Sequence, residues 1–229
     1  MGAQPIRTIT GRLVFLKDGG GEWGRENFSV TEHEVLRTYR SCMEMDDYDI
    51  FRETNWSMTR EGLPLEGFSR ETVDGETTAH SWYRLTDGLA EVESWSKEGG
   101  RKSHRLPVTG RITHLGLHAL MNDCMVSAAR GCTDAGVEKP ALCLTNSSDG
   151  YGRGADSPSI VEPLVTYLGS EPVTVRAGTF EGEHFQVRWS DDVPTYSHFW
   201  VLKDCFIPLR LYGASGPVSY ELSDLAVHA

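Results

Sequence analysis

Residues 65–96 read LEGFSRETVDGETTAHSWYRLTDGLAEVESWS, and this stretch decides the fold. Three runs rich in β-branched and aromatic residues, 65–74, 77–86 and 89–96, are separated by Asp74-Gly75 and Asp87-Gly88. An Asp-Gly pair between two such runs is a strong hairpin signal, because the tight turn needs positive φ at its central residues. The stretch therefore predicts three consecutive antiparallel strands.

The same rhythm continues on both sides of this stretch. Strand-like runs separated by turn residues occur before and after it, at 6–17, 24–31, 34–45, 48–60, 101–106, 161–168, 172–177, 180–189, 195–203, 206–212 and 217–223. Such even spacing favours a mainly β fold in which one antiparallel sheet curls into a half-barrel or open barrel. We expect residues 1–229 to form a single β-rich domain.

One segment breaks the strand pattern. In residues 116–130, GLHALMNDCMVSAAR, apolar side chains recur at helical spacing, and Gly131 follows as a C-terminal cap. This predicts one α-helix, around which the sheet wraps. Residues 145–158 are rich in Ser, Gly and Asp, which predicts a loop.

The charge balance excludes one class of partner. The chain has 22 Lys and Arg against 33 Asp and Glu, a formal net charge of −11. So acidic a chain repels the phosphate backbone of nucleic acids, and we expect no nucleic-acid partner.

The apolar runs are too short for a membrane or export signal. Near the N-terminus the longest, Leu13 to Leu16, has four residues. A signal peptide needs about 7–15 apolar residues and a spanning helix about 20, so we expect a cytoplasmic protein without membrane insertion. The five cysteines form no C-x-x-C pair and are predicted to be free thiols.

The C-terminal part carries a recurring pattern of motifs. It runs Val175-Arg176-Ala177-Gly178-Thr179-Phe180, then Trp200 followed by Asp204, then Ile207-Pro208-Leu209-Arg210-Leu211, then Tyr220-Glu221-Leu222. Over residues 171–224 this pattern resembles a group of uncharacterised bacterial β-proteins whose fold is similar to the LolA/LolB lipoprotein carriers. The resemblance implies an open half-barrel around a helix. The Ile-Pro-Leu-Arg-Leu motif is expected to be compatible with an edge strand.

Two motifs that suggest a cofactor or a metal lack the required context. Gly19 to Gly24 fits G-x-G-x-x-G, but a strand-like run follows it instead of the helix that would hold a pyrophosphate. His114 and His118 have the spacing of a helical metal pair, yet Gly116 lies between them and no third ligand is evident. We therefore predict neither a cofactor nor a bound metal.

The predicted helix carries an unusual set of polar residues. His118, Asn122 and Asp123 interrupt its apolar pattern. A helix that plugs a half-barrel turns one face to the cavity, and a histidine beside a carboxylate is suited to proton transfer near neutral pH. We predict that His118 or Asp123 moves a proton and that Asn122 contacts the ligand. The alternative is that these residues tie the helix to the sheet through hydrogen bonds.

The strands supply the remaining candidates. Tyr196, His198 and Trp200 alternate with Ser197 and Lys203, which prefer water, so the first three are predicted to face inward. A cavity lined by Tyr, His and Trp suits an aromatic ligand.

Tyr39 or Arg188 is predicted to polarise a substrate oxygen, and His198 is a further group for proton transfer. The predicted function is a cofactor-independent lyase or isomerase acting on a small apolar or aromatic molecule. The alternative is a non-catalytic carrier of a lipid or other hydrophobic ligand. Exposed sheet edges allow a homodimer in either case.

Overall fold

The computed structural model describes residues 7–147, 153, 157–190, 195–213 and 218–228. The first half is a meander that follows the predicted runs closely. Its elements are β1 (Arg7–Leu16), β2 (Glu22–Glu32), β3 (Leu36–Met45), the 3-10 turn η1 (Asp46–Tyr48), β4 (Ile50–Thr59), β5 (Pro64–Val73), β6 (Glu76–Thr86), β7 (Leu89–Ser96) and β8 (Gly100–Pro107). Gly75 and Gly88 take positive φ in the two Asp-Gly turns, as predicted.

The second half contains the helical segment and the returning strands. Its elements are β9 (His114–Gly116), α1 (Leu120–Asp123), α2 (Met125–Arg130), β10 (Glu138–Pro140), β11 (Cys143–Thr145), β12 (Ser159–Val161), β13 (Leu164–Val175), β14 (Gly178–Arg188), β15 (Ser197–Leu202), β16 (Ile207–Tyr212) and β17 (Ser219–His228). Most of the predicted loop at 145–158 lies outside the described residues.

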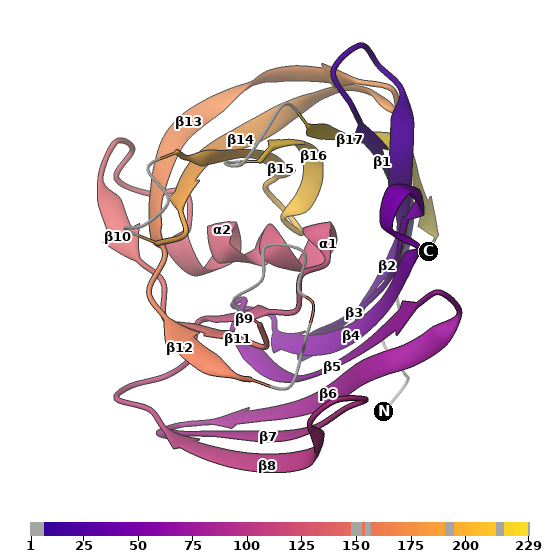
Figure 1. The fold of residues 1–229 in the computed structure, drawn as a ribbon. Coiled ribbons are helices and arrows are strands. Elements are labelled where there is room, and N and C mark those ends of the chain that lie inside the picture. The colour runs from indigo at the N-terminus through magenta and orange to yellow at the C-terminus, as the bar shows by residue number, and fades with distance from the viewer. Residues whose placement is uncertain (1–6, 148–152, 154–156, 191–194, 214–217, 229) are drawn as a thin grey trace.

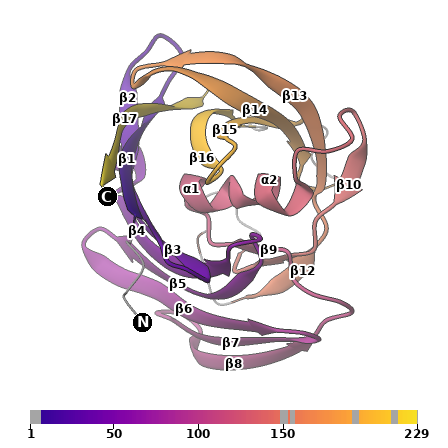
Figure 2. The same ribbon diagram turned by 180° about the vertical axis from the view of Figure 1, so that it is seen from behind.

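The strands form one large open sheet. Within the described residues, fourteen strands pair in the order β10-β13-β14-β15-β16-β17-β1-β2-β3-β4-β5-β6-β7-β8, so both halves of the chain join through β17 and β1. The sheet curls around α1 and α2, and β6–β8 extend beyond the ring (Figures 1 and 2). β10 and β8 are its two edges, which confirms the predicted curled antiparallel sheet around a helical segment.

The helix is shorter than the sequence pattern predicted. The expected start at residue 116 is wrong, because β9 occupies His114–Gly116 and His118 has a φ of 57°. Helix α1 begins only at Leu120, and α2 follows after Cys124. Within the described residues, neither helix is long and apolar enough to cross a membrane.

Three short strands form a second sheet inside the curl. β9 pairs in parallel with β11, which pairs antiparallel with β12. β9 packs against β5 at Gly67, where a Cβ atom would lie 2.5 Å from Leu115 Cδ2. A larger residue at position 67 would have to displace the Leu115 side chain, so glycine favours this close approach of β9 to β5.

Two details of the C-terminal strands differ from expectation. The runs predicted separately at 161–168 and 172–177 overlap a single strand, β13, whose register shifts between Tyr167 and Gly169. The Ile-Pro-Leu-Arg-Leu motif, which is compatible with an edge strand, lies instead in the interior strand β16, paired with β15 and β17. Pro208 is tolerated there because it lies at a β-bulge opposite Val201.

Candidate functional site

The interior face of the first half carries charged residues at the level of α1. Glu26 on β2, Arg52 on β4 and Glu71 on β5 are each less than 5% exposed. With Asp123 at the end of α1, they form a group that we call the charged layer. Buried charges are costly unless they are paired or hydrogen-bonded, so the contacts of each residue indicate its role.

Glu26 holds the start of α1 from a neighbouring strand. Its carboxylate accepts hydrogen bonds from the backbone N–H of Leu120 (2.7 Å) and Met121 (3.0 Å), and from Ser41 Oγ (2.6 Å). Burial raises the pKa of Glu26, and these three bonds oppose the rise. Ala119, at the N-cap position, has no side chain that can accept these bonds, so Glu26 replaces the usual cap.

Arg52 ties the turn before the helix to the sheet. Its Nη2 donates to Glu71 Oε2 at 3.0 Å, and its Nη1 donates to the carbonyl oxygen of His118 at 2.8 Å. The second bond holds His118 in its uncommon positive-φ conformation. The buried Arg52–Glu71 pair thus fixes where α1 begins and where Asp123 lies.

Asp123 differs from the rest of the charged layer because it is only half-buried. Burial raises the pKa of its carboxyl to about 7, with a further rise from the charge of Glu26 and an opposing effect from Arg52. A carboxyl with such a pKa is present in both protonation states near neutral pH. It can therefore donate and accept a proton under those conditions.

His118 is oriented by the last residue of β11 and by the residues that follow it. Its Nε2 lies 3.2 Å from Thr145 Oγ1 and 3.1 Å from the carbonyl oxygen of Ser147. Since a carbonyl only accepts, the second contact requires a proton on Nε2. The ring of His118 is therefore directed toward residues 145–147, and His118 lies five positions before Asp123 in the sequence.

Two other predicted site residues, Asn122 and Tyr39, make contacts that stabilise the fold. Asn122 Oδ1 accepts from the backbone N–H of Leu117 at 2.6 Å, which closes the turn ahead of α1. Tyr39 is 2% exposed and stacks on Trp56, with ring centroids 4.9 Å apart and an interplanar angle of 6°. Burial raises the pKa of Tyr39, so its hydroxyl stays protonated.

The orientation predicted for Tyr196, His198 and Trp200 is wrong. On β15 it is Phe199 and Val201 that pack with the helical segment, so the alternating His198 and Trp200 lie on the opposite face. Ser197, expected to prefer water, is buried, and its hydroxyl accepts a hydrogen bond from Trp189 Nε1 at 3.0 Å. Tyr196 precedes the strand and is 39% exposed.

A second polar cluster lies on that opposite face. His184 Nε2 and His198 Nδ1 are 3.0 Å apart, and the His184 ring stacks on Trp200 with centroids 4.0 Å apart. Trp200 Nε1 donates to Glu171 Oε1 at 2.5 Å. Arg188 on β14 forms an ion pair with Glu138 of β10 at 3.5 Å. The predicted site residues therefore divide into an interior set and a set on the other face of the sheet.

The sequence analysis missed Glu26, Arg52 and Glu71. A signal for them existed in the strand alternation: Arg52 shares a strand face with Ile50 and Trp56, which are buried. A charged residue within an otherwise apolar strand face marks a buried polar contact.

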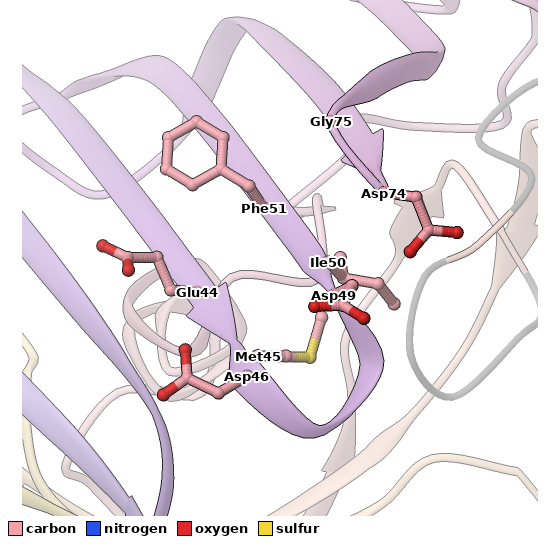
Figure 3. A pocket seen from close by; sticks show the side chains of 8 residues that line it. All are labelled: Glu44, Met45, Asp46, Asp49, Ile50, Phe51, Asp74 and Gly75. Carbon is pink, nitrogen blue, oxygen red and sulfur yellow. The ribbon is translucent and has the colours of Figure 1, made fainter.

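An open, acidic hollow of about 700 Å³ lies where β3–β4 and β5–β6 turn (Figure 3). Asp46, Asp49, Asp74 and Glu44 line it. Arg25 pairs with Glu44 at 2.5 Å and with Asp46 at 2.8 Å, so part of this charge is neutralised. Across the described ranges, no group of three or more His, Cys, Asp or Glu residues is placed to hold a metal ion.

Comparison with known proteins shows the fold alone. No family model matches the chain, and no curated protein matches it in sequence. A β-barrel-like protein of the domain of unknown function DUF1849 from Brucella abortus is similar in structure, with a TM-score of 0.57, 14% identity and 100% of both chains covered. A DUF1089 family protein from Pseudomonas aeruginosa has a TM-score of 0.53 and 8% identity, over 82% of this chain and 90% of that one. The chain thus has the fold of β-barrel-like bacterial proteins.

Proposed function

We propose that the protein is a cofactor-independent lyase or isomerase that uses Asp123 as its general acid and base. The observation that carries this proposal is the position of Asp123: it is the half-buried member of a charged layer whose other members are buried and engaged in bonds. Lyase and isomerase reactions need proton transfer and correct positioning of the substrate, and the residues of the charged layer can provide both.

The supporting groups have distinct roles in this proposal. Glu26 and the Arg52–Glu71 pair are positioning residues, because they hold the backbone of residues 118–121, just ahead of Asp123, and are themselves buried. His118 is half-buried and its ring is held by contacts with Thr145 and Ser147, and it is the second candidate for proton transfer. The substrate is a small apolar or aromatic molecule that approaches Asp123 from the solvent side.

The alternative carrier function needs an apolar interior. The structural similarity to β-barrel-like proteins supports it on fold alone, as does the motif resemblance to uncharacterised bacterial β-proteins whose fold is similar to the LolA/LolB carriers. Against it, the interior contains a charged layer and large fully buried side chains such as Trp56, Phe15 and Phe185. A lipid chain would have to displace them, so we place this function second.

We further propose that the protein is cytoplasmic and that it forms a homodimer. Of the two sheet edges, β8 carries Arg101, Lys102 and Arg105, so pairing two β8 strands would bring like charges together. β10 is the better edge for a dimer. Analytical ultracentrifugation over a range of protein concentrations tests the dimer, and a monomer at every concentration would contradict it.

Two measurements test the enzymatic function. The first is ¹³C NMR of aspartate-labelled protein over a pH titration, with Asp123 assigned through Asp123→Asn and with Asp49→Asn as a matched exposed control. We expect one carboxyl that titrates near pH 7 and is absent from the Asp123→Asn spectrum alone. A normal pKa near 4 for Asp123 would contradict the proposal.

The second measurement is native mass spectrometry of protein purified from its own host. A retained small aromatic or apolar metabolite, lost in Asp123→Asn and kept in Asp49→Asn, supports the enzyme. A retained fatty acid or phospholipid whose occupancy is unchanged in Asp123→Asn supports the carrier and overturns the proposed lyase or isomerase activity.

A further inference from the structure

A second hollow lies on the outer face of the strands that extend beyond the ring. It has a volume of about 500 Å³ and lies over β5–β8, the lower strands in Figure 1. The inner faces of these strands are buried, for example at Tyr83 and Val92, so the hollow is separated from the charged layer by the thickness of the sheet. A volume of this size is within the range of small-molecule sites.

Aromatic rings form the floor of this hollow. Phe68, His80, Trp82 and Trp95, which we call the aromatic patch, come from three neighbouring strands. Phe68 lies opposite Trp82, and His80 lies opposite Trp95 in the register of the sheet. The His80 and Trp95 rings are stacked with centroids 5.4 Å apart and an angle of 19°, and Trp82 is 40% exposed.

Hydrogen-bonding groups border the aromatic patch. Glu93 and Arg101 line the hollow, and Glu93 accepts hydrogen bonds from Arg101 at 3.2 Å and from Ser103 at 2.8 Å. A carboxylate beside a guanidinium offers an acceptor and a donor side by side. This arrangement matches two adjacent hydroxyl groups, each of which both donates and accepts.

The charges on this face are balanced. Four cations on or beside this face pair with carboxylates: Arg70 with Glu53, Lys97 with Glu76, Arg101 with Glu93 and Arg105 with Glu91. Arg84 lies on the same exposed face of β6, and Glu66 lies opposite it on β5. A balanced surface neither attracts a polyanion nor an acidic peptide by long-range electrostatics. A purely apolar ligand also fits poorly, because the hollow is open and its rim is ionic. The class of ligand that remains has an apolar face and a polar edge, and it carries no net charge.

We propose that the outer hollow over β5–β8 binds a neutral carbohydrate, with a pyranose ring stacked on Trp82 and Trp95 and its hydroxyls bonded to Glu93 and Arg101. The ring C–H groups lie against the indole faces, while the equatorial hydroxyls point to the ionic rim. This site is independent of the acid–base function proposed for Asp123.

The test is an NMR titration of ¹⁵N-labelled protein with maltotetraose, cellotetraose and chitotetraose, followed through the indole N–H signals of Trp82 and Trp95. At least one sugar is expected to shift both signals and to saturate, with a dissociation constant of roughly millimolar order. Trp82→Ala and Trp95→Ala should each weaken binding by about tenfold or more, since each removes a stacking surface.

The controls separate this site from others. Tyr212→Ala removes an aromatic side chain that is 42% exposed on β16, and Asp123→Asn changes the interior site; both should leave sugar binding unchanged. The proposal is overturned if none of the three sugars shifts the Trp82 and Trp95 signals, or if binding survives both tryptophan substitutions. Saturable binding of indole or of an acidic peptide in place of the sugars would also overturn it.

Discussion

The two walls that enclose the helical segment differ in chemistry. On one side, β13–β16 present an apolar wall to it, made of Val165, Phe185, Val187, Phe199, Val201 and Leu211. On the other side, β2, β4 and β5 contribute Glu26, Arg52 and Glu71. The apolar wall holds the helices by burial, which has no preferred direction, whereas the charged layer fixes individual backbone atoms of residues 118–121. The candidate site lies on the side of the charged layer, where hydrogen bonds with defined directions hold the backbone.

The largest expected effect is the loss of one partner of the buried ion pair. Arg52→Ala leaves Glu71 charged and buried, which costs roughly 3–5 kcal/mol of unfolding free energy. Urea denaturation of wild type and variant measures it. The double variant Arg52→Met with Glu71→Leu should recover most of the loss, because no unpaired charge remains. If Arg52→Ala proves near neutral, the charged layer does not position the helix.

A smaller effect is expected from the apolar wall. Leu211 is 2% exposed, and Leu211→Ala removes buried methyl groups and leaves a cavity, at a cost of roughly 3 kcal/mol. Urea denaturation at pH 5 and pH 8 should give the same difference from wild type at both values. A difference that depends on pH would show that this wall is coupled to the charged layer.

The smallest effect concerns pH. Because the pKa of Asp123 is raised to about 7, the folded protein binds a proton that the unfolded chain has lost above pH of about 4. The contribution of Asp123 to stability is therefore greatest below pH 4 and falls as the pH rises to about 7. Asp123→Asn should remove this fall and become more stable than wild type above pH 7, by about 2 kcal/mol once partial solvent contact is allowed for.

Thermal denaturation of wild type, Asp123→Asn and Glu26→Gln across this pH range distinguishes the two carboxyls. Glu26→Gln removes the charge and keeps one accepting oxygen, so it should retain the bond from Met121 and lose the bond from Leu120, whose N–H would face the amide NH2 group. An identical pH profile for wild type and Asp123→Asn would show that Asp123 has a normal pKa.

Local signals predicted the strands well and the site only in part. The Asp-Gly turns and the alternating runs depend on neighbouring residues, and the first eight strands were placed within a few residues of their observed bounds. The prediction of the helix start failed because that start is fixed by Glu26 and Arg52, which lie far away in sequence. The prediction of which face of β15 points inward failed because Ser197 is buried and bonded to Trp189, and residue type alone does not reveal such a contact.

By itself, the sequence determined the antiparallel sheet, its curl and the presence of a helical segment near Asp123, since turn chemistry and side-chain period act over a few residues. Only the tertiary structure decided which strand face looks inward and which charges meet. The pKa of Asp123, for example, responds to the charges of Glu26 and Arg52, which lie 97 and 71 positions away along the chain and come near it only through the pairing of the strands.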